Sequence, residues 1–196
     1  MMNRTARIER NTSETRITAS IDLDGGGTAD ISTGIPFFDH MLNLFARHGF
    51  FDMTILAQGD IGVDNHHTVE DMGIVLGSLV NEALGERKGI VRYGHAVTPM
   101  DETLSEVSLD LSNRPYLVYH VPDNLGMCGT FDTRDVKEFL HAFAMKGGMN
   151  LHVNVRYGEN AHHIIESVFK ALGRALDWAV TIDERIKGHH STKGVI

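Results

Sequence analysis

A set of metal-binding residue types occurs twice in this chain. His66-His67-Thr68-Val69-Glu70 returns 96 residues later as His162-His163-Ile164-Ile165-Glu166. Residues four apart lie on one face of a helix, so the first histidine of each copy can share a metal ion with its glutamate. The second histidine is rotated by about 100° and is free to bind another ion. The repeat therefore predicts a paired metal site, held between elements or between subunits.

The repeat extends beyond these ligands. Gly77 aligns with Gly173 at the same offset, and residues 39–46 resemble residues 137–144. The second alignment sets His40 opposite Glu138, so each half is expected to supply one further ligand. Imidazole and carboxylate ligands suit Mn, Fe, Zn or Ni, and the sequence alone leaves that choice open.

Basic residues could form an anion pocket beside this site. Arg92, Arg114 and Lys170 lie near turns or on the second metal helix, and the chain ends in Ser191-Thr192-Lys193-Gly194-Val195-Ile196. Arginine and lysine supply charge-assisted donors to phosphate. Any one of them alone is more typical of a solvated surface charge. The glycine run at 25–27 is interpreted as a hairpin turn, because no helix follows it directly as a phosphate loop requires.

The apolar pattern predicts the elements that must position these residues. Strands are expected over 6–22, 29–31 and 51–57, with helices over 37–47 and 68–84. The second half repeats this order, with strands over 95–98, 104–110, 116–120 and 150–156 and helices over 133–145 and 164–181. This predicts an α+β fold of two similar halves, 1–85 and 86–196, packed as one compact unit with helices on one face of each sheet.

Composition narrows the class of protein. The 196 residues are 42% hydrophobic, and the formal net charge of −8 argues against a nucleic-acid surface. The single cysteine, Cys128, suits a reducing cytoplasm. Residues 1–15 lack the apolar core of a signal peptide. No apolar run approaches the ~18 residues that a membrane span needs. We therefore expect a cytoplasmic protein that binds neither membrane nor nucleic acid.

Five separated motifs follow one another along the chain: Gly34-Ile35-Pro36-Phe37-Phe38-Asp39-His40-Met41-Leu42, Asp64-Asn65-His66-His67-Thr68-Val69-Glu70-Asp71, Pro99-Met100-Asp101-Glu102, His162-His163-Ile164-Ile165-Glu166 and Ser191-Thr192-Lys193-Gly194. Together they resemble one family, imidazoleglycerol-phosphate dehydratase, a lyase of histidine biosynthesis. The resemblance covers nearly the whole chain. It implies two similar halves of the ribosomal protein S5 domain 2-like type. It also implies two Mn²⁺ ions per active site at subunit contacts, in a cage-like homo-oligomer of about 24 subunits.

The resemblance also implies residue roles. The metal ligands would be His40, His66, His67, Glu70, Glu138, His162, His163 and Glu166. Glu138 is a departure, because many family members carry histidine there. Substrate contacts would come from Glu14, His40, His48, Arg92, Arg114, Lys170, Ser191, Thr192 and Lys193. Catalysis would involve Glu14, His67, Glu70, His163 and Glu166.

The implied reaction is the dehydration of imidazoleglycerol phosphate to imidazole acetol phosphate. Two metal ions on the ring nitrogens would favour the imidazolate form, whose electrons can expel the neighbouring hydroxyl. Two alternatives use the same ligands. One is a two-metal phosphoesterase, which would activate water. The other is a metal-storage or metal-dependent assembly protein, which would bind no imidazole compound.

Overall fold

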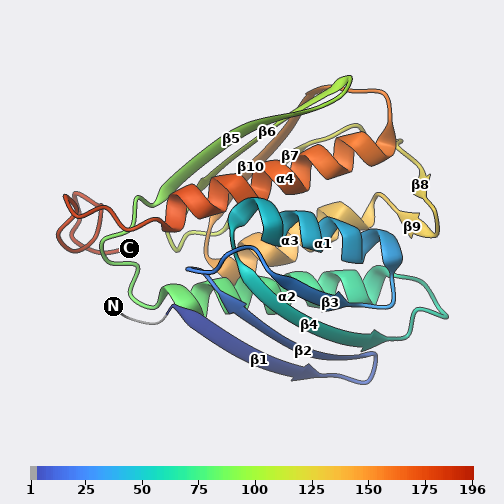
Figure 1. The fold of residues 1–196 in the computed structure, drawn as a ribbon, viewed down its shortest axis with the longest axis horizontal. Coiled ribbons are helices and arrows are strands. Elements are labelled where there is room, and N and C mark those ends of the chain that lie inside the picture. The colour runs from blue at the N-terminus through green and yellow to red at the C-terminus, as the bar shows by residue number, and fades with distance from the viewer. Residues whose placement is uncertain (1–3) are drawn as a thin grey trace.

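The computed structural model describes residues 4–196, which form two four-stranded sheets with four helices between them (Figure 1). The first half contains β1 (Thr5–Asn11), β2 (Thr15–Asp22), β3 (Ala29–Ser32), α1 (Pro36–Gly49), β4 (Asp52–Gly59) and α2 (His66–Leu84). The second contains β5 (Tyr93–Met100), β6 (Thr103–Asp110), β7 (Tyr116–His120), β8 (Met127–Cys128), β9 (Phe131–Asp132), α3 (Asp135–Gly147), β10 (Asn150–Tyr157) and α4 (Ala161–Val180). The predicted α+β fold with two similar halves is confirmed. The small hairpin β8–β9 is an insertion in the second half that the sequence did not predict.

Both sheets have the same strand order, β1-β2-β4-β3 in one and β5-β6-β10-β7 in the other. In each, the strand between the two helices is inserted between the second and third strands. β4 runs antiparallel to β2 and parallel to β3, and β10 has the same relation to β6 and β7. The halves therefore agree in topology as well as in element order.

Two expectations about the first sheet are wrong. The glycine run at 25–27 is not a hairpin turn, because β4 separates β2 from β3. The Asp52 carboxylate instead holds this loop by accepting the backbone N–H groups of Gly26 and Thr28. The segment 6–22 is two strands, since the chain turns tightly between Asn11 and Thr15. No apolar residue stands between Ile8 and Ile17, and the apolar positions change from even to odd numbers there, so the alternation itself marks the break.

The helices pair across the two halves. α2 lies on β1 and β2 and packs against α3, while α4 lies on β5 and β6 and packs against α1. Fully buried phenylalanines fill the space between them, with ring centroids 5.3 Å apart for Phe38 and Phe139 and 6.1 Å apart for Phe45 and Phe143. One hydrophobic core thus contains side chains from both halves.

Two glycines at equivalent positions let the helix pairs approach closely. A Cβ atom at Gly173 of α4 would lie 2.5 Å from the carbonyl oxygen of Phe45 and 3.0 Å from the Gly49 nitrogen. A Cβ atom at Gly77 of α2 would lie 2.5 Å from the carbonyl oxygen of Phe143. These neighbours are backbone atoms, so they cannot move aside as a side chain can. The glycines therefore set the spacing that brings α1 to α4 and α3 to α2.

Replacing Gly173 with alanine is expected to destabilise the protein. Alanine favours a helix interior by ~1 kcal/mol over glycine, but overpacking against fixed backbone costs ~1–3 kcal/mol. The predicted net result is a lower urea midpoint for Gly173→Ala. Gly26→Ala is the control, because nothing lies within 4 Å of a Cβ atom there. Equal or greater stability of Gly173→Ala would contradict the close-contact argument.

Candidate active site

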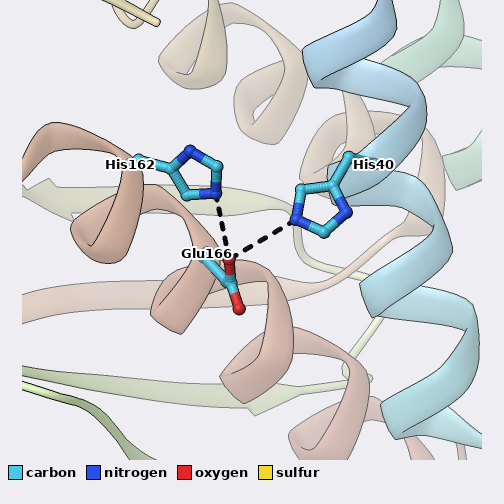
Figure 2. Close-up of side chains that lie close together, drawn as sticks. All are labelled: His40, His162 and Glu166. Atoms are coloured by element: carbon cyan, nitrogen blue, oxygen red, sulfur yellow. Dashed lines mark hydrogen bonds and ion pairs between the residues drawn. The ribbon is translucent and has the colours of Figure 1, made fainter.

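The first functional cluster joins α1 to the start of α4 (Figure 2). Nε2 of His162 lies 3.1 Å and Nε2 of His40 lies 3.4 Å from Oε2 of Glu166. His162 and Glu166 are four residues apart, as the predicted shared helix face requires. Asn160 caps α4 by accepting the backbone N–H groups of His162 and His163, which fixes the first turn that carries both imidazoles. The three ligand atoms all lie within 4.8 Å of one another, so one metal ion could bind all three.

Glu166 is held in its charged form by its surroundings. The residue is only 7% exposed. Burial by itself raises the pKa of the Glu166 carboxyl, but the hydrogen bond and positive charge of Lys170 outweigh it and leave the pKa below its usual value. Nζ of Lys170 lies 2.6 Å from Oε1, so Oε2 is the oxygen that faces the imidazoles. A charged carboxylate with one free oxygen is a good metal ligand.

The equivalent residues of the other half lie on α2 and α3. Nε2 of His66 is 3.7 Å from Oε2 of Glu70, and Nδ1 of His66 is 3.8 Å from Oδ1 of Asp135. His66, Asp135 and Glu138 line one cavity of about 660 Å³. Within residues 4–196, only the His40 set meets the tight three-ligand spacing. The side chains of the second set are therefore close to one another but too far apart for that spacing. Glu138 lines the same cavity as His66.

His67 and His163 turn away from these two sets. Nδ1 of His67 lies 3.0 Å and 3.2 Å from the two carboxylate oxygens of Asp60. Nδ1 of His163 lies 2.8 Å from Oε2 of Glu102. A further carboxylate lies 3.9 Å from each Nε2, Glu14 beside His67 and Asp101 beside His163. Neither imidazole joins a ligand cluster of its own chain.

These contacts shift the protonation equilibria of both rings. The hydrogen bond that His67 donates to Asp60 raises the pKa of His67, and the one that His163 donates to Glu102 raises the pKa of His163. In return, His163 and the backbone N–H of Asn160 lower the pKa of Glu102 to about 2. A metal ion that binds either histidine must therefore compete with a proton that is held more tightly than usual.

The basic residues gather in a cavity of about 900 Å³ after the end of α4. Its lining includes five of the predicted substrate residues: Arg92, Arg114, Ser191, Thr192 and Lys193. Lys187 also lines it. Among residues 4–196, Arg114, Lys187 and Lys193 form no ion pair with a carboxylate within 4.0 Å. The cavity therefore offers free positive charge to an anion.

Arg92 differs from the other basic residues in this cavity. Its guanidinium forms a two-pronged ion pair with Asp110, at 2.6 Å and 3.0 Å, and the pair raises the pKa of Arg92. A third nitrogen donates to the carbonyl of His190 at 2.8 Å. Arg92 thus anchors the C-terminal segment that carries Ser191 and Lys193, besides adding charge to the cavity.

Four predicted substrate residues lie outside this cavity, and one of them, His40, belongs to the cluster with His162 and Glu166. Lys170 is paired with Glu166 near the first metal cluster. His48 lines a separate cavity of about 360 Å³ with Arg174 and Trp178. There burial, followed by the charges of Lys170 and Arg174, lowers the pKa of His48. Glu14 lies beside His67. One chain therefore does not bring all the predicted substrate residues to a single place.

Comparison with known proteins identifies the family. The model of the family described as imidazoleglycerol-phosphate dehydratase matches residues 33–176. The imidazoleglycerol-phosphate dehydratase of Desulfosudis oleivorans is 60% identical over 195 residues, covering 100% of both chains. That of Syntrophus aciditrophicus is 56% identical over 197 residues, again covering 100% of both. The chain belongs to the imidazoleglycerol-phosphate dehydratase family. It is an enzyme of the hydro-lyase class.

Solved structures of imidazoleglycerol-phosphate dehydratases share the fold. The Staphylococcus aureus crystal structure matches with a TM-score of 0.83 and 40% identity, covering 91% of this chain and 99% of that chain. The Pyrococcus furiosus structure matches with a TM-score of 0.84 and 40% identity, covering 96% and 100%. The likeness therefore extends over both halves and both ligand-bearing repeats.

Sequence reasoning missed two carboxylates of this dehydratase fold, Asp60 and Asp135. Both lie near histidines predicted to bind metal only because of tertiary packing, Asp60 from the end of β4 and Asp135 from the start of α3. The acid pair Asp101-Glu102 stands in a recognised motif, but its sequence position in the β5–β6 turn gives no sign that it reaches α4. Spacing along the chain carries no signal for such contacts.

Proposed function

We propose that this chain dehydrates imidazoleglycerol phosphate to imidazole acetol phosphate, with two Mn²⁺ ions holding the substrate imidazole. The observation that carries the proposal is the convergence of His40, His162 and Glu166 on one point, from two different helices. Family membership supplies the substrate, and the basic cavity supplies a binding place for its phosphate.

The donor set fits the proposed metal. Two imidazoles and a carboxylate suit Mn²⁺, and the remaining coordination positions are open to substrate. The His66, Glu70 and Glu138 set repeats this chemistry in the other half, with a carboxylate where the first set has His40. When bound, the ions supply Lewis-acid polarisation of the substrate ring. In this proposal the Glu166 carboxylate stays ionised, which the charge of Lys170 favours.

The proposed active site is shared between subunits. The proposed metal cluster is at the start of α4, whereas the residues that line the basic cavity include the segment after its end. Figure 1 shows this C-terminal segment at the end of α4 that is opposite β8 and β9. A helix of 20 residues is ~30 Å long, which is much longer than a small phosphorylated imidazole. One substrate molecule therefore needs the metal ligands of one chain and the basic cavity of another. We propose a closed homo-oligomer, such as the cage implied by the family resemblance.

Exposed apolar side chains support this assembly. Phe50 is 58% exposed and Trp178 is 59% exposed, and both line the His48 cavity. The outward Nε2 atoms of His67 and His163 fit the same proposal, because a neighbouring subunit can bring a metal ion to them. No helix among residues 4–196 has the length and apolar character to cross a membrane. We also propose that the protein is cytoplasmic.

The chain's own residues have distinct proposed roles. Arg114, Lys193 and the Ser191 and Thr192 hydroxyls would bind the phosphate. Glu14 lies on the Nε2 side of His67, where it can take or give a proton next to the substrate. Glu70 and Glu166 would bind metal and could handle protons through the same carboxylates. These roles follow the family resemblance and are supported by where the side chains lie.

The decisive experiment incubates manganese-loaded protein with imidazoleglycerol phosphate. Formation of the ketone product without release of inorganic phosphate is the expected result. A two-metal phosphoesterase would release phosphate from this substrate and from a generic phosphate ester. A protein that only stores metal would consume no substrate at all. Either of these outcomes would reject the proposal.

Lys193→Ala is expected to weaken substrate binding far more than turnover. Losing one charge-assisted hydrogen bond to phosphate costs about 1.5–3 kcal/mol, which corresponds to a KM increase of ~10–100-fold. kcat should change little, because the phosphate is bound equally in the ground and transition states. Lys146→Ala, an exposed lysine on α3, is the control. A fall in kcat at unchanged KM would show that Lys193 does not bind the phosphate.

A further inference from the structure

The second histidine of each repeat has the same environment, although different elements build it. Nδ1 of His67 contacts Asp60, which follows β4. Nδ1 of His163 contacts Glu102, which lies in the β5–β6 turn. A carboxylate can only accept a hydrogen bond, so the hydrogen of each ring is on Nδ1. The lone pair of the neutral ring is then on Nε2, the nitrogen that faces outward.

We propose that Glu102 and Asp60 are positioning residues that keep the Nε2 atoms of His163 and His67 free for metal. This inference rests on the proposed metal-dependent function and deepens it. A metal-binding histidine commonly donates its other ring N–H to a carboxylate, which fixes the tautomer and the ring orientation. His162 and His66 are different, because their Nε2 atoms face carboxylates of their own helices.

Glu102 is itself fixed on its other side. Its Oε1 accepts the backbone N–H of Asn160 at 2.9 Å and the Thr103 hydroxyl at 3.1 Å, while Oε2 faces His163. Asn160 is also the cap of α4. One carboxylate therefore ties the β5–β6 turn to the helix start and to the ring of His163 at once.

The repeat explains why the two histidines use different carboxylates. Glu14 directly precedes β2 and Glu102 directly precedes β6, so the two occupy equivalent hairpin turns. Glu102 contacts Nδ1 of its histidine, whereas Glu14 lies 3.9 Å from Nε2 of His67. Asp60 supplies the Nδ1 contact in the first half. This division leaves Glu14 on the side of His67 where a metal ion and substrate would bind.

Glu102→Gln tests the proposal without removing the side chain. The glutamine carbonyl must keep facing the Asn160 N–H, so the NH₂ group faces Nδ1 of His163. Nδ1 must then accept, and the ring hydrogen moves to Nε2, where it blocks metal. We expect a Mn²⁺ affinity ~10–100-fold below that of the unsubstituted protein. Glu106→Gln is the matched control, since Glu106 lies on β6, pairs with Arg156 of the neighbouring strand β10 and does not contact His163.

A second readout separates positioning from a general loss of structure. The ¹⁵N chemical shifts of the His163 ring, assigned by comparison with His163→Ala in metal-free protein, report which nitrogen carries the hydrogen. We expect Nδ1–H in the unsubstituted protein and in Glu106→Gln, and Nε2–H in Glu102→Gln. Asp60→Asn should behave like the unsubstituted protein, because both Asp60 oxygens face His67 and an amide can rotate its carbonyl toward Nδ1.

The outcomes are distinct. An unchanged Mn²⁺ affinity or an Nδ1–H tautomer in Glu102→Gln would overturn the positioning role while leaving the proposed function intact. Failure of the unsubstituted protein to bind Mn²⁺ would overturn the proposed function. In that case the tautomer of His163 would still decide whether Glu102 fixes the ring.

Discussion

His163→Ala is expected to lose at least ~1,000-fold in kcat/KM, because Lewis-acid stabilisation is worth several kcal/mol and each 1.36 kcal/mol is tenfold in rate. The fold should be unaffected. His163 is a partly exposed residue in the first turn of α4, and the α4 cap comes from Asn160. The loss should therefore appear in activity and in bound Mn²⁺, with an unchanged urea midpoint.

His141→Ala is the matched control for this substitution. His141 is exposed on α3 and has no place in either ligand set. Its activity and Mn²⁺ content should equal those of the unsubstituted enzyme. Full activity of His163→Ala after removal of metal would contradict the role that the proposed function gives to this histidine.

The helical part of the fold could be predicted closely from the sequence. Each helix buries one apolar face, so its periodicity is strong, and the predicted helices differ from α1 to α4 by at most three residues at either end. The strands were harder. The break between β1 and β2 coincides with the polar stretch 9–16, where the apolar alternation stops and changes phase, but the predicted strand ran through it. The place of β4 between β2 and β3 depends on long-range pairing that no local pattern encodes.

The candidate site divides in the same way. His162 and Glu166 could be predicted to meet, because four residues along a helix fix their relative position. His40 was found only through the internal repeat, which carries information about tertiary packing. The contacts of Asp60 and Glu102 could not be found by either route, since they arise where a loop or turn crosses the start of a helix.

The duplication also explains where the carboxylates and the basic residues of the candidate site lie. In each half, a helix start carries the ligands, and a neighbouring hairpin brings carboxylates to the second histidine. Only the second half continues into a basic C-terminal segment, which Arg92 anchors through the carbonyl of His190. The proposed metal ligands are thus repeated in both halves, whereas the cavity proposed to bind an anion belongs to the second half and follows the opposite end of α4 from that half's own proposed ligands.

Mixed assemblies of two inactive variants are expected to recover activity. His163→Ala removes a proposed metal ligand, and Arg114→Ala removes a proposed phosphate contact at the opposite end of α4. If each site takes these two groups from different chains, some sites in a mixed assembly contain both intact. Random mixing in equal amounts leaves about one quarter of the sites intact, since each of the two groups is present with a probability of one half.

The two variants would be co-expressed with different tags, purified through both tags and assayed for ketone formation. Activity should rise from near the background of each variant to about one quarter of the unsubstituted rate, by the same two-chain statistics. Assemblies of two differently tagged His163→Ala chains are the control and should stay inactive. No recovery in the mixed assemblies would mean that His163 and Arg114 serve the same site from one chain. The ~30 Å length of α4 argues against that arrangement.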